Sequence, residues 1–326
     1  MSTLAPAAPA PAPAARRPLR ALRPRGLGWL IWRQNRLALA VLALGTVVVV
    51  AFLLRERFTV DDLDTRFKAL GCTTGFSPSC ATVIQQQEAL QGNWRTAMLA
   101  LMVLPALLGA LLAAQPLAGD LEHGRHTMLW TQSVSPSRWL THRLVWPALV
   151  LTLVGTAISL TAGWGWDWSN PPLPLGSWDQ GTASQTMAPV YPALMLTAFA
   201  LGAAVCLLVR RTIPAVVATL GLYGGLMAAV QLLYPYLMPL RTVVHHGGDD
   251  LLPTDWIVSD GAVEAGRMIP YSQCGPSNCA AGNLTFEKFH PMTDFWPMEY
   301  IETGVLVVLA AALTGLAYWA LRRLTR

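Results

Sequence analysis

The chain has 326 residues and a net charge of +5, and 53% of its residues are hydrophobic while only 13% are charged. This charged fraction is about half that of an ordinary soluble domain, and the apolar residues are gathered into long uncharged blocks. These features exclude a soluble globular protein and predict an integral membrane protein. The basic residues lie beside the apolar blocks, where membrane topology explains them, so we expect no nucleic-acid partner.

Residues 1–26 are rich in alanine, proline and arginine. Because so many prolines and so little apolar surface cannot form a packed core, we expect a disordered cytoplasmic tail without the apolar region of a signal peptide. Residues 26–36 place Trp29 and Trp32 on one helical face beside arginines, which predicts an interfacial helix. The alternative is that these residues extend the first membrane span.

Six blocks are long and apolar enough to cross roughly 30 Å of hydrocarbon as helices. They cover about residues 37–54, 96–115, 144–163, 190–209, 213–238 and 304–321. Prolines in several blocks would disfavour helices in water, but a membrane bundle tolerates them. Residues 27–326 are therefore expected to form one transmembrane domain. The predicted fold is an all-α membrane protein of six transmembrane helices, with cytoplasmic interfacial helices and a large outer segment, residues 239–303, before the last span.

The distribution of charge predicts the orientation of these spans. Fifteen of the 23 basic residues lie before the first block, between the second and third, between the fourth and fifth, or after the sixth. The positive-inside rule then places both termini in the cytoplasm, as in a multi-pass protein of the cell membrane. Sixteen of the eighteen acidic residues lie in the other segments, and only Asp120 and Glu122 share the basic side.

Four of the five cysteines lie in the outer segments. An oxidising compartment and the Gly, Pro and Asn residues between them favour disulfides Cys72–Cys80 and Cys274–Cys279, which leaves Cys206 as a free thiol within a span. A metal site at the second pair would need further ligands, and we expect none. The tryptophans of residues 164–189 suit a belt at the level of the lipid headgroups.

The sequence lacks the motifs of an enzyme. It contains only two lysines and no phosphate-binding loop of the G-x-x-x-x-G-K-[ST] kind, so we expect that the chain does not hydrolyse ATP and holds no cofactor or metal. None of the six blocks contains Asp, Glu, Lys, Arg or His, which argues against proton-coupled transport and against an intramembrane enzyme. Small residues such as Ala198 with Gly202, and Gly221 with Gly225, indicate close helix packing.

The most informative stretch lies between the second and third blocks and reads AGDLEHGRHTMLWTQSVSPSRWLTHRL. On a helix, one side gathers the apolar residues Leu117, Leu121, Met128 and Leu129. The polar residues are mostly displaced from that side, and they are Asp120, Glu122, His123, Arg125 and His126. This pattern predicts an amphipathic helix on the inner membrane surface. Ser135 then offers an N-cap and Pro136 a first-turn proline, so a second helix can begin there and run into the third span.

This stretch resembles the type-2 ABC exporter permeases, in particular an actinobacterial branch of them. The resemblance is carried by an acidic, glycine-containing start, a W-T-Q-S run and an R-W pair, which are Glu122, Gly124, Trp130, Thr131, Gln132, Ser133, Arg138 and Trp139. The W-R-Q run at Trp32, Arg33 and Gln34 and the six-span plan are also similar. The family commonly has threonine directly after the glycine and a basic residue two positions later, where this chain has Arg125 and Thr127.

The resemblance implies a permease subunit that exports an apolar or amphipathic substrate. The family's coupling helix corresponds to residues 117–133 and would rest in a groove of a separate cytosolic ATPase, which binds the ATP and Mg²⁺. A second permease copy, in a homodimer or heterodimer, would complete the transporter within the lipid bilayer. The coupling residues implied are Asp120, Leu121, Glu122, Gly124, Arg125, Trp130, Gln132, Ser133, Arg138 and Trp139.

Two alternatives remain open. Glu122 and Arg125 are three residues apart, so they can form an ion pair on a solvated helix with no partner at all. The whole chain can also be interpreted as a membrane-anchored sensor or assembly factor, whose disulfide-looped outer segments bind a ligand or a partner. Such a protein would not need a helix that faces an ATPase.

Overall fold

The structure is a computed structural model. It describes residues 27–72, 77–124, 135–166, 178, 184–245, 251–252, 254–264, 266–275, 279 and 284–325. For residues 27–35 only the backbone is described. The predicted tail of residues 1–26 lies outside this part of the chain.

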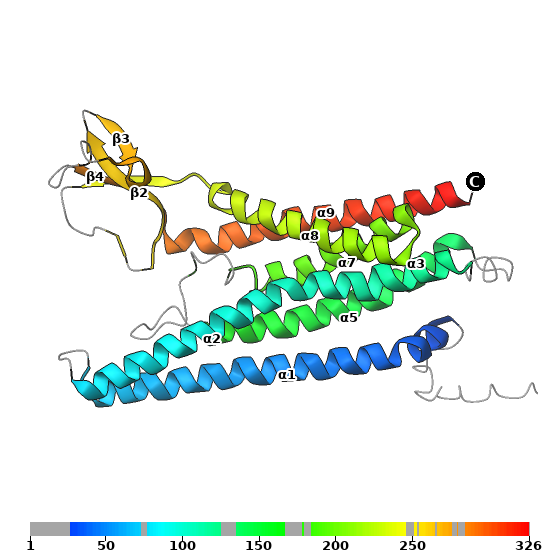
Figure 1. The fold of residues 1–326 in the computed structure, drawn as a ribbon, viewed down its shortest axis with the longest axis horizontal. Coiled ribbons are helices and arrows are strands. Elements are labelled where there is room, and N and C mark those ends of the chain that lie inside the picture. The colour runs from blue at the N-terminus through cyan, green and yellow to red at the C-terminus, as the bar shows by residue number, and fades with distance from the viewer. Residues whose placement is uncertain are drawn as a thin grey trace, which may run out of the picture.

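Six long apolar helices dominate the described residues, which confirms the predicted number of spans. In chain order the helices are α1 (Leu27–Ala69), α2 (Pro78–Gly109), which continues through the π-helical turn η2 (Ala110–Ala114) into α3 (Gln115–Glu122), then α5 (Pro136–Gly165), α7 (Val190–Val209), α8 (Thr212–Leu233) and α9 (Phe295–Leu324). They lie lengthwise beside one another in an elongated bundle (Figure 1). Their length and composition are those of an integral membrane protein.

Several helices extend well beyond the predicted spans. α1 begins at Leu27, so residues 27–36 are helical, as the predicted interfacial helix requires, and they join the first span without a gap. At its other end α1 runs to Ala69, about 15 residues and roughly 20 Å past the predicted end of that span. α2 begins soon afterwards, at Pro78. The first outer segment is therefore a helical hairpin.

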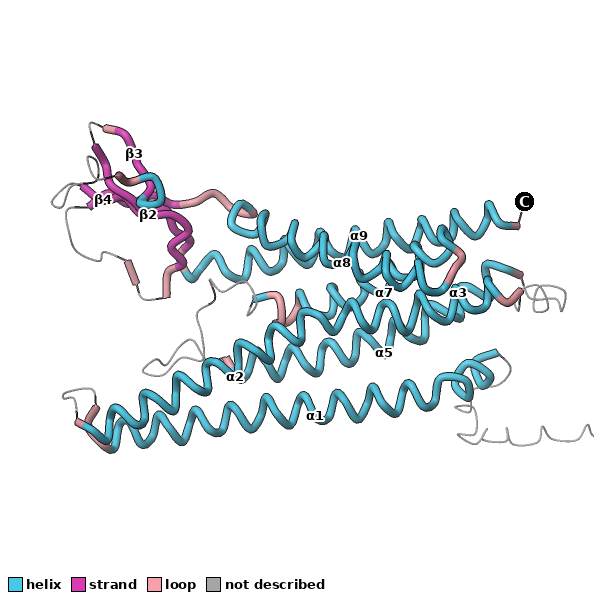
Figure 2. The backbone as a smooth tube through the Cα atoms, in the orientation of Figure 1, coloured by secondary structure: helices cyan, strands magenta, loops and turns pink. Residues whose placement is uncertain are grey.

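The last outer segment contains a sheet, so the prediction of an all-α protein is wrong in this region. Strands β1 (Arg241–His245), β2 (Trp256–Glu264), β3 (Arg267–Pro270) and β4 (Leu284–His290) are antiparallel and stand in the order β1-β4-β2-β3. Figure 2 shows them gathered beyond the end of α8 and the start of α9, on the side toward which the α1–α2 hairpin also extends. On β4, Phe286 and Phe289 are both buried and stand three positions apart, so they face opposite sides of the sheet. A hydropathy window as long as a membrane helix does not detect such short strands.

The cysteines pair as the sequence predicts. A disulfide joins Cys72 to Cys80 across the tip of the α1–α2 hairpin, and another joins Cys274 to Cys279 beside the sheet. Cys206 is a buried free thiol in α7. Both bridges close short loops, so each one fixes local structure and neither joins distant elements.

α7 forms the centre of the bundle. It is apolar on all sides, most of its residues are buried, and it contacts α2, α5, α8 and α9. Its crossing with α2 is close because a side-chain carbon at Gly109 would overlap the carbonyl oxygen of Ala198, and one at Gly202 would overlap that of Gly109. In contrast, a side-chain carbon at Gly221 or Gly225 of α8 would have no neighbour within 4 Å in the described part of the chain.

The tryptophans of residues 164–189 do not form a simple headgroup belt. Trp164 is exposed, but Trp166 and Trp178 are each only 3% exposed. The indole N–H of Trp178 donates to the carbonyl oxygen of Thr254 at 2.6 Å, and its ring packs edge-on against Trp256 of β2 at 5.4 Å. Trp178 is therefore buried between α9 and the sheet, whereas Trp166 packs edge-on against Phe295 at the start of α9. Trp168 lies outside the described residues.

The longer helices also carry buried carboxylates. The predicted spans contain no ionisable side chain. However, α1 continues past the predicted end of the first span, and α9 begins before the predicted start of the last one. The two helices bury Glu56, Glu299 and Glu302, which are 4%, 0% and 4% exposed. The absence of ionisable groups therefore does not hold for the full length of the helices.

Candidate functional site

The predicted coupling segment lies at one end of the bundle, which we call the basic end. It is defined by Arg36, Arg138, Arg143, Arg210, Arg211, Arg322 and Arg323. The end of α3, the start of α5, the α7–α8 turn and the C-terminus meet here (Figure 1). The sheet and the tip of the α1–α2 hairpin lie at the opposite end, which we call the sheet end (Figure 1).

The sequence predicts that residues 117–122 begin a separate amphipathic helix. In the structure they do not. They continue the second span through α3, because Leu117 and Ala118 are only 2% and 0% exposed and α3 packs against α7 and α8. Leu121 is partly buried and packs against the same core. The rest of the predicted coupling helix lies outside the described residues, which applies to Arg125, Trp130, Gln132 and Ser133.

A local irregularity lets the second span continue this far. Pro116 has no backbone N–H and cannot donate to the carbonyl of Leu112, which would break a regular helix. The π-helical turn directly before Pro116 accommodates that missing bond. α3 then ends with Nδ1 of His123 at 2.9 Å from the carbonyl oxygen of Gly119, and with Gly124 at a φ of +67°. This left-handed conformation favours glycine and stops the helix.

Asp120 faces the interior of the bundle. It is 7% exposed, and its Oδ2 accepts a hydrogen bond from Nη2 of Arg143 in α5 at 2.6 Å. The two side chains are only 10% and 15% exposed, so this charge-assisted bond is shielded from most of the solvent. Asp120 therefore has its charged partner within the same chain, and the pair links α3 to α5.

Glu122 caps the start of α8. Its Oε2 accepts a hydrogen bond from the backbone amide of Thr212 at 3.0 Å and another from the Thr212 hydroxyl at 2.6 Å. The first amides of a helix lack partners within the helix, and the helix dipole makes that end partially positive, so a carboxylate is favourable there. Arg211, at the N-cap position of α8, supplies no side-chain cap of its own.

A very short turn brings the start of α8 to α3. Only Arg210 and Arg211 separate α7 from α8, and Arg210 adopts a left-handed φ of 60° while its amide donates to the carbonyl of Cys206 at 2.8 Å. Sequence reasoning did not identify Thr212 or Arg143 as site residues. The sequence did contain a signal at Thr212. A helix that begins there has no Ser, Thr, Asp or Asn directly before it to act as N-cap, so its first amides need another acceptor.

α5 begins where the sequence predicts. Ser135 is its N-cap, with a hydroxyl that accepts from the amide of Arg138 at 3.4 Å, and Pro136 stands in the first turn. Trp139 is only 2% exposed and belongs to the hydrophobic core, whereas Arg138 is exposed. Of the predicted R-W pair, only Arg138 therefore presents its side chain at the surface of this chain.

Together these contacts make the end of α3 a junction of three helices. Asp120 bonds to α5 and Glu122 bonds to α8, so a force on the segment that follows α3 would reach both helices. The described residues contain no group of three or more His, Cys, Asp or Glu that could hold a metal ion. What this junction offers is a mechanical connection between spans.

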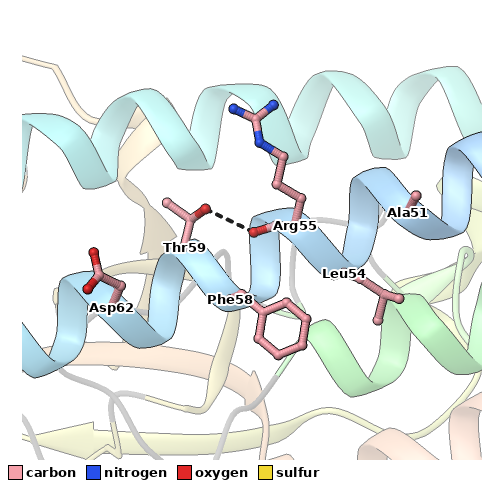
Figure 3. Close-up of a pocket in the computed structure, with 6 residues that line it drawn as sticks. All are labelled: Ala51, Leu54, Arg55, Phe58, Thr59 and Asp62. Carbon is pink, nitrogen blue, oxygen red and sulfur yellow. Dashed lines mark hydrogen bonds between the residues drawn. The ribbon is translucent and has the colours of Figure 1, made fainter.

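A second feature is an open groove along α1 toward the sheet end. Its volume is about 580 Å³, and it is lined by Ala51, Leu54, Arg55, Phe58, Thr59 and Asp62 (Figure 3). The Phe58 ring lies edge-on to Trp164 of α5 at 6.0 Å. Arg55 reaches toward α2 and also lines a neighbouring groove of about 430 Å³ there. Leu54 and Phe58 thus lie on one side of α1, and the Arg55 guanidinium lies on the other (Figure 3).

The comparisons with known proteins identify one family. A family model described as ABC-2 membrane transporter related matches residues 41–235, which is more than half of the chain. The matched region runs from α1 into the end of the fifth span and includes the junction at the end of α3. No curated protein and no solved structure matches the chain.

Proposed function

Because the chain belongs to the ABC-2 membrane transporter related family, we propose that it is the membrane-spanning permease of an ATP-binding-cassette exporter. A separate cytosolic ATPase binds the ATP and Mg²⁺, and this chain hydrolyses no nucleotide itself. The observation that carries the proposal is the family match, which spans five of the six helices and the three-helix junction at the basic end.

The basic end is the cytoplasmic face in this proposal. The positive-inside rule supports that orientation, since the arginines that define the basic end flank the spans closely. Residues 117–133 then form the surface that meets the ATPase. Movement of that surface on ATP binding would act through Asp120 on α5 and through Glu122 on α8, because each carboxylate is bonded to a different helix. A second permease copy in the cell membrane completes the transport path.

The proposed substrate is apolar or amphipathic. The groove on α1 supports a molecule with an apolar part, because Ala51, Leu54 and Phe58 line it with carbon. The Arg55 guanidinium turns toward α2 and the neighbouring groove, where it would bind an anionic head. Arg55→Ala would then reduce transport, whereas Lys68→Ala, which changes an exposed basic residue farther along the same helix, would not.

The proposal is tested with a candidate ABC ATPase from the same genome, sought first in the reading frames next to that of this chain. The permease is purified with that ATPase, reconstituted in vesicles, and assayed for ATP-dependent movement of fluorescent amphiphiles. The expected result is a stable complex with transport that requires ATP hydrolysis. If no ATPase co-purifies and the vesicles show no ATP-dependent movement, the permease assignment fails.

The alternative of a membrane-anchored sensor or assembly factor rests on a different observation. The outer segments fold as a disulfide-closed helical hairpin and a four-stranded sheet, which are definite surfaces for a partner. The same co-purification separates the two functions. A sensor would retain its partner at the sheet end and would not bring down an ATPase.

A further inference from the structure

At the sheet end, α9 buries two carboxylates that the proposed transport mechanism does not use. Glu299 and Glu302 are three residues apart, so they share one face of the helix, and they are 0% and 4% exposed. That face packs against α7, the helix at the centre of the bundle. Both acids thus lie in the interior at the sheet end, where α9 begins (Figure 1).

The oxygens of this pair have few partners. The hydroxyl of Tyr234 donates to Oε1 of Glu299 at 3.1 Å, and the side chain of Ser184 is hydrogen-bonded to the same tyrosine. The second oxygen of Glu299 and both oxygens of Glu302 are buried and have no hydrogen-bond partner among the described residues. Within the described part of the chain, three buried carboxylate oxygens therefore have no hydrogen-bond partner.

No positive side chain of the described residues neutralises the pair. α7 contains no charged residue, and the charged groups of α5 lie at the basic end. The nearest acid along the chain, Asp294, is itself paired with Arg241 at 3.3 Å, and one of its oxygens lies 3.6 Å from Nδ1 of His290. An unpaired ionised carboxylate costs several kcal/mol when it is buried, so two of them require compensation.

We propose that Glu299 and Glu302 hold one hard metal cation, Na⁺ or Ca²⁺, at the sheet end of the bundle. The donor atoms gathered there are oxygens from two carboxylates and the hydroxyls of Tyr234 and Ser184. An all-oxygen set of this kind suits Na⁺ or Ca²⁺ and contains none of the nitrogen or sulfur ligands that zinc and copper prefer. Acidic residues in membrane helices commonly mark ion sites for the same energetic reason.

Cation binding at this place would fix the outer half of the bundle. Glu299 and Glu302 belong to α9, Tyr234 follows α8, and Ser184 precedes α7. An ion held among them would join three spans that meet at the sheet end, far from the ATPase-facing junction. The site therefore does not depend on the proposed transport function.

The test is thermal unfolding of the purified full-length protein in detergent. Choline chloride is replaced by NaCl at constant ionic strength, and CaCl₂ is titrated separately. We expect a saturable rise in melting temperature of about 5 °C for one of these ions at a hundredfold excess over its Kd. Glu302→Gln and Glu299→Gln should abolish the rise. Glu88→Gln, which changes an exposed carboxylate on α2, should leave it intact.

Three outcomes would overturn the proposal. The first is a wild-type melting temperature that neither ion changes. The second is a full ion-dependent rise that persists in Glu302→Gln. The third is a melting temperature that depends on pH alone, because protons would then neutralise the pair without a metal. If the glutamine variants do not fold, equilibrium binding of ²²Na⁺ or ⁴⁵Ca²⁺ to the wild-type protein decides, and the absence of a bound ion rejects the site.

Discussion

The carboxylate of Glu122 accepts two hydrogen bonds from Thr212, which lies 90 positions later in the chain. One bond comes from the backbone amide and one from the hydroxyl, so the acid at the end of α3 completes the first turn of α8. The sequence alone assigned this acid to a partner surface or to an ion pair with Arg125. Its bonds to Thr212 give it a role within the chain, as a link between the end of α3 and the start of α8.

The first prediction concerns this link. Glu122→Ala should reduce ATP-driven transport strongly while the ATPase still co-purifies, because it removes both hydrogen bonds between α3 and Thr212. Thr212→Val should reduce transport less, because the backbone amide of residue 212 can still donate to Glu122. The double variant should be no worse than Glu122→Ala, since the carboxylate takes part in both bonds. If Glu122→Ala loses the ATPase while Thr212→Val keeps it, the carboxylate acts on the partner and the intramolecular link is not its function.

The second prediction concerns the pair formed by Asp120 and Arg143. Arg143→Met should destabilise the protein by about 2 kcal/mol, because it leaves a largely buried carboxylate without its cation, although residual solvent access keeps the loss below that of a fully buried pair. Thermal unfolding in detergent measures the effect. Arg138→Met, which removes an exposed arginine from the same helix, is the control and should change little. Equal losses in both variants would contradict the prediction.

The third prediction tests the crossing of α2 and α7. Gly109→Ala and Gly202→Ala should each lower stability by about 1–3 kcal/mol, because the added carbon meets a backbone carbonyl that cannot move aside easily. Gly221→Ala should be neutral or slightly stabilising, since its added carbon has space and alanine favours the helix. A loss of stability at Gly221 as large as that at Gly109 would show that α8 packs against a partner there.

The fourth prediction concerns the cysteines. Mass spectrometry of unreduced peptides should find the bridges Cys72–Cys80 and Cys274–Cys279. A maleimide should label Cys206 only after unfolding, because that thiol is buried in α7. Replacement of Cys72 and Cys80 by serine should cost about 2 kcal/mol, as expected for a short loop. More than one reactive thiol per unfolded, unreduced chain would reject the pairing.

The fifth prediction tests the orientation. Trp130→Cys in a Cys206→Ser background should react with a membrane-impermeant maleimide only after the cells are permeabilised, because the positive-inside rule places the segment between the second and third spans in the cytoplasm. Thr73→Cys, in the first predicted outer segment, serves as the opposite control and should react in intact cells. Labelling of position 130 in intact cells would reverse the topology.

Much of the architecture follows from the sequence because bilayer thickness sets a length that any spanning helix must reach. The six apolar blocks gave the six helices, and Ser135 with Pro136 marked the start of α5. The cysteine pairs followed from proximity within short outer loops. The stretch around Glu122 pointed to the family that the comparison then identified. Each of these features depends on residues close together in the chain.

The tertiary structure alone decided which side chains meet. In a membrane helix both the lipid-facing and the buried faces are apolar, so periodicity does not reveal which face packs, and Gly109 could not be distinguished from Gly221. Hydropathy also ends a span at the first charge, which hid the buried Glu299 and Glu302 at the start of α9. The partners of Asp120 and Glu122 depend on how distant helices are placed, because a hydrogen bond is fixed by geometry across the bundle and not by the order of residues along it.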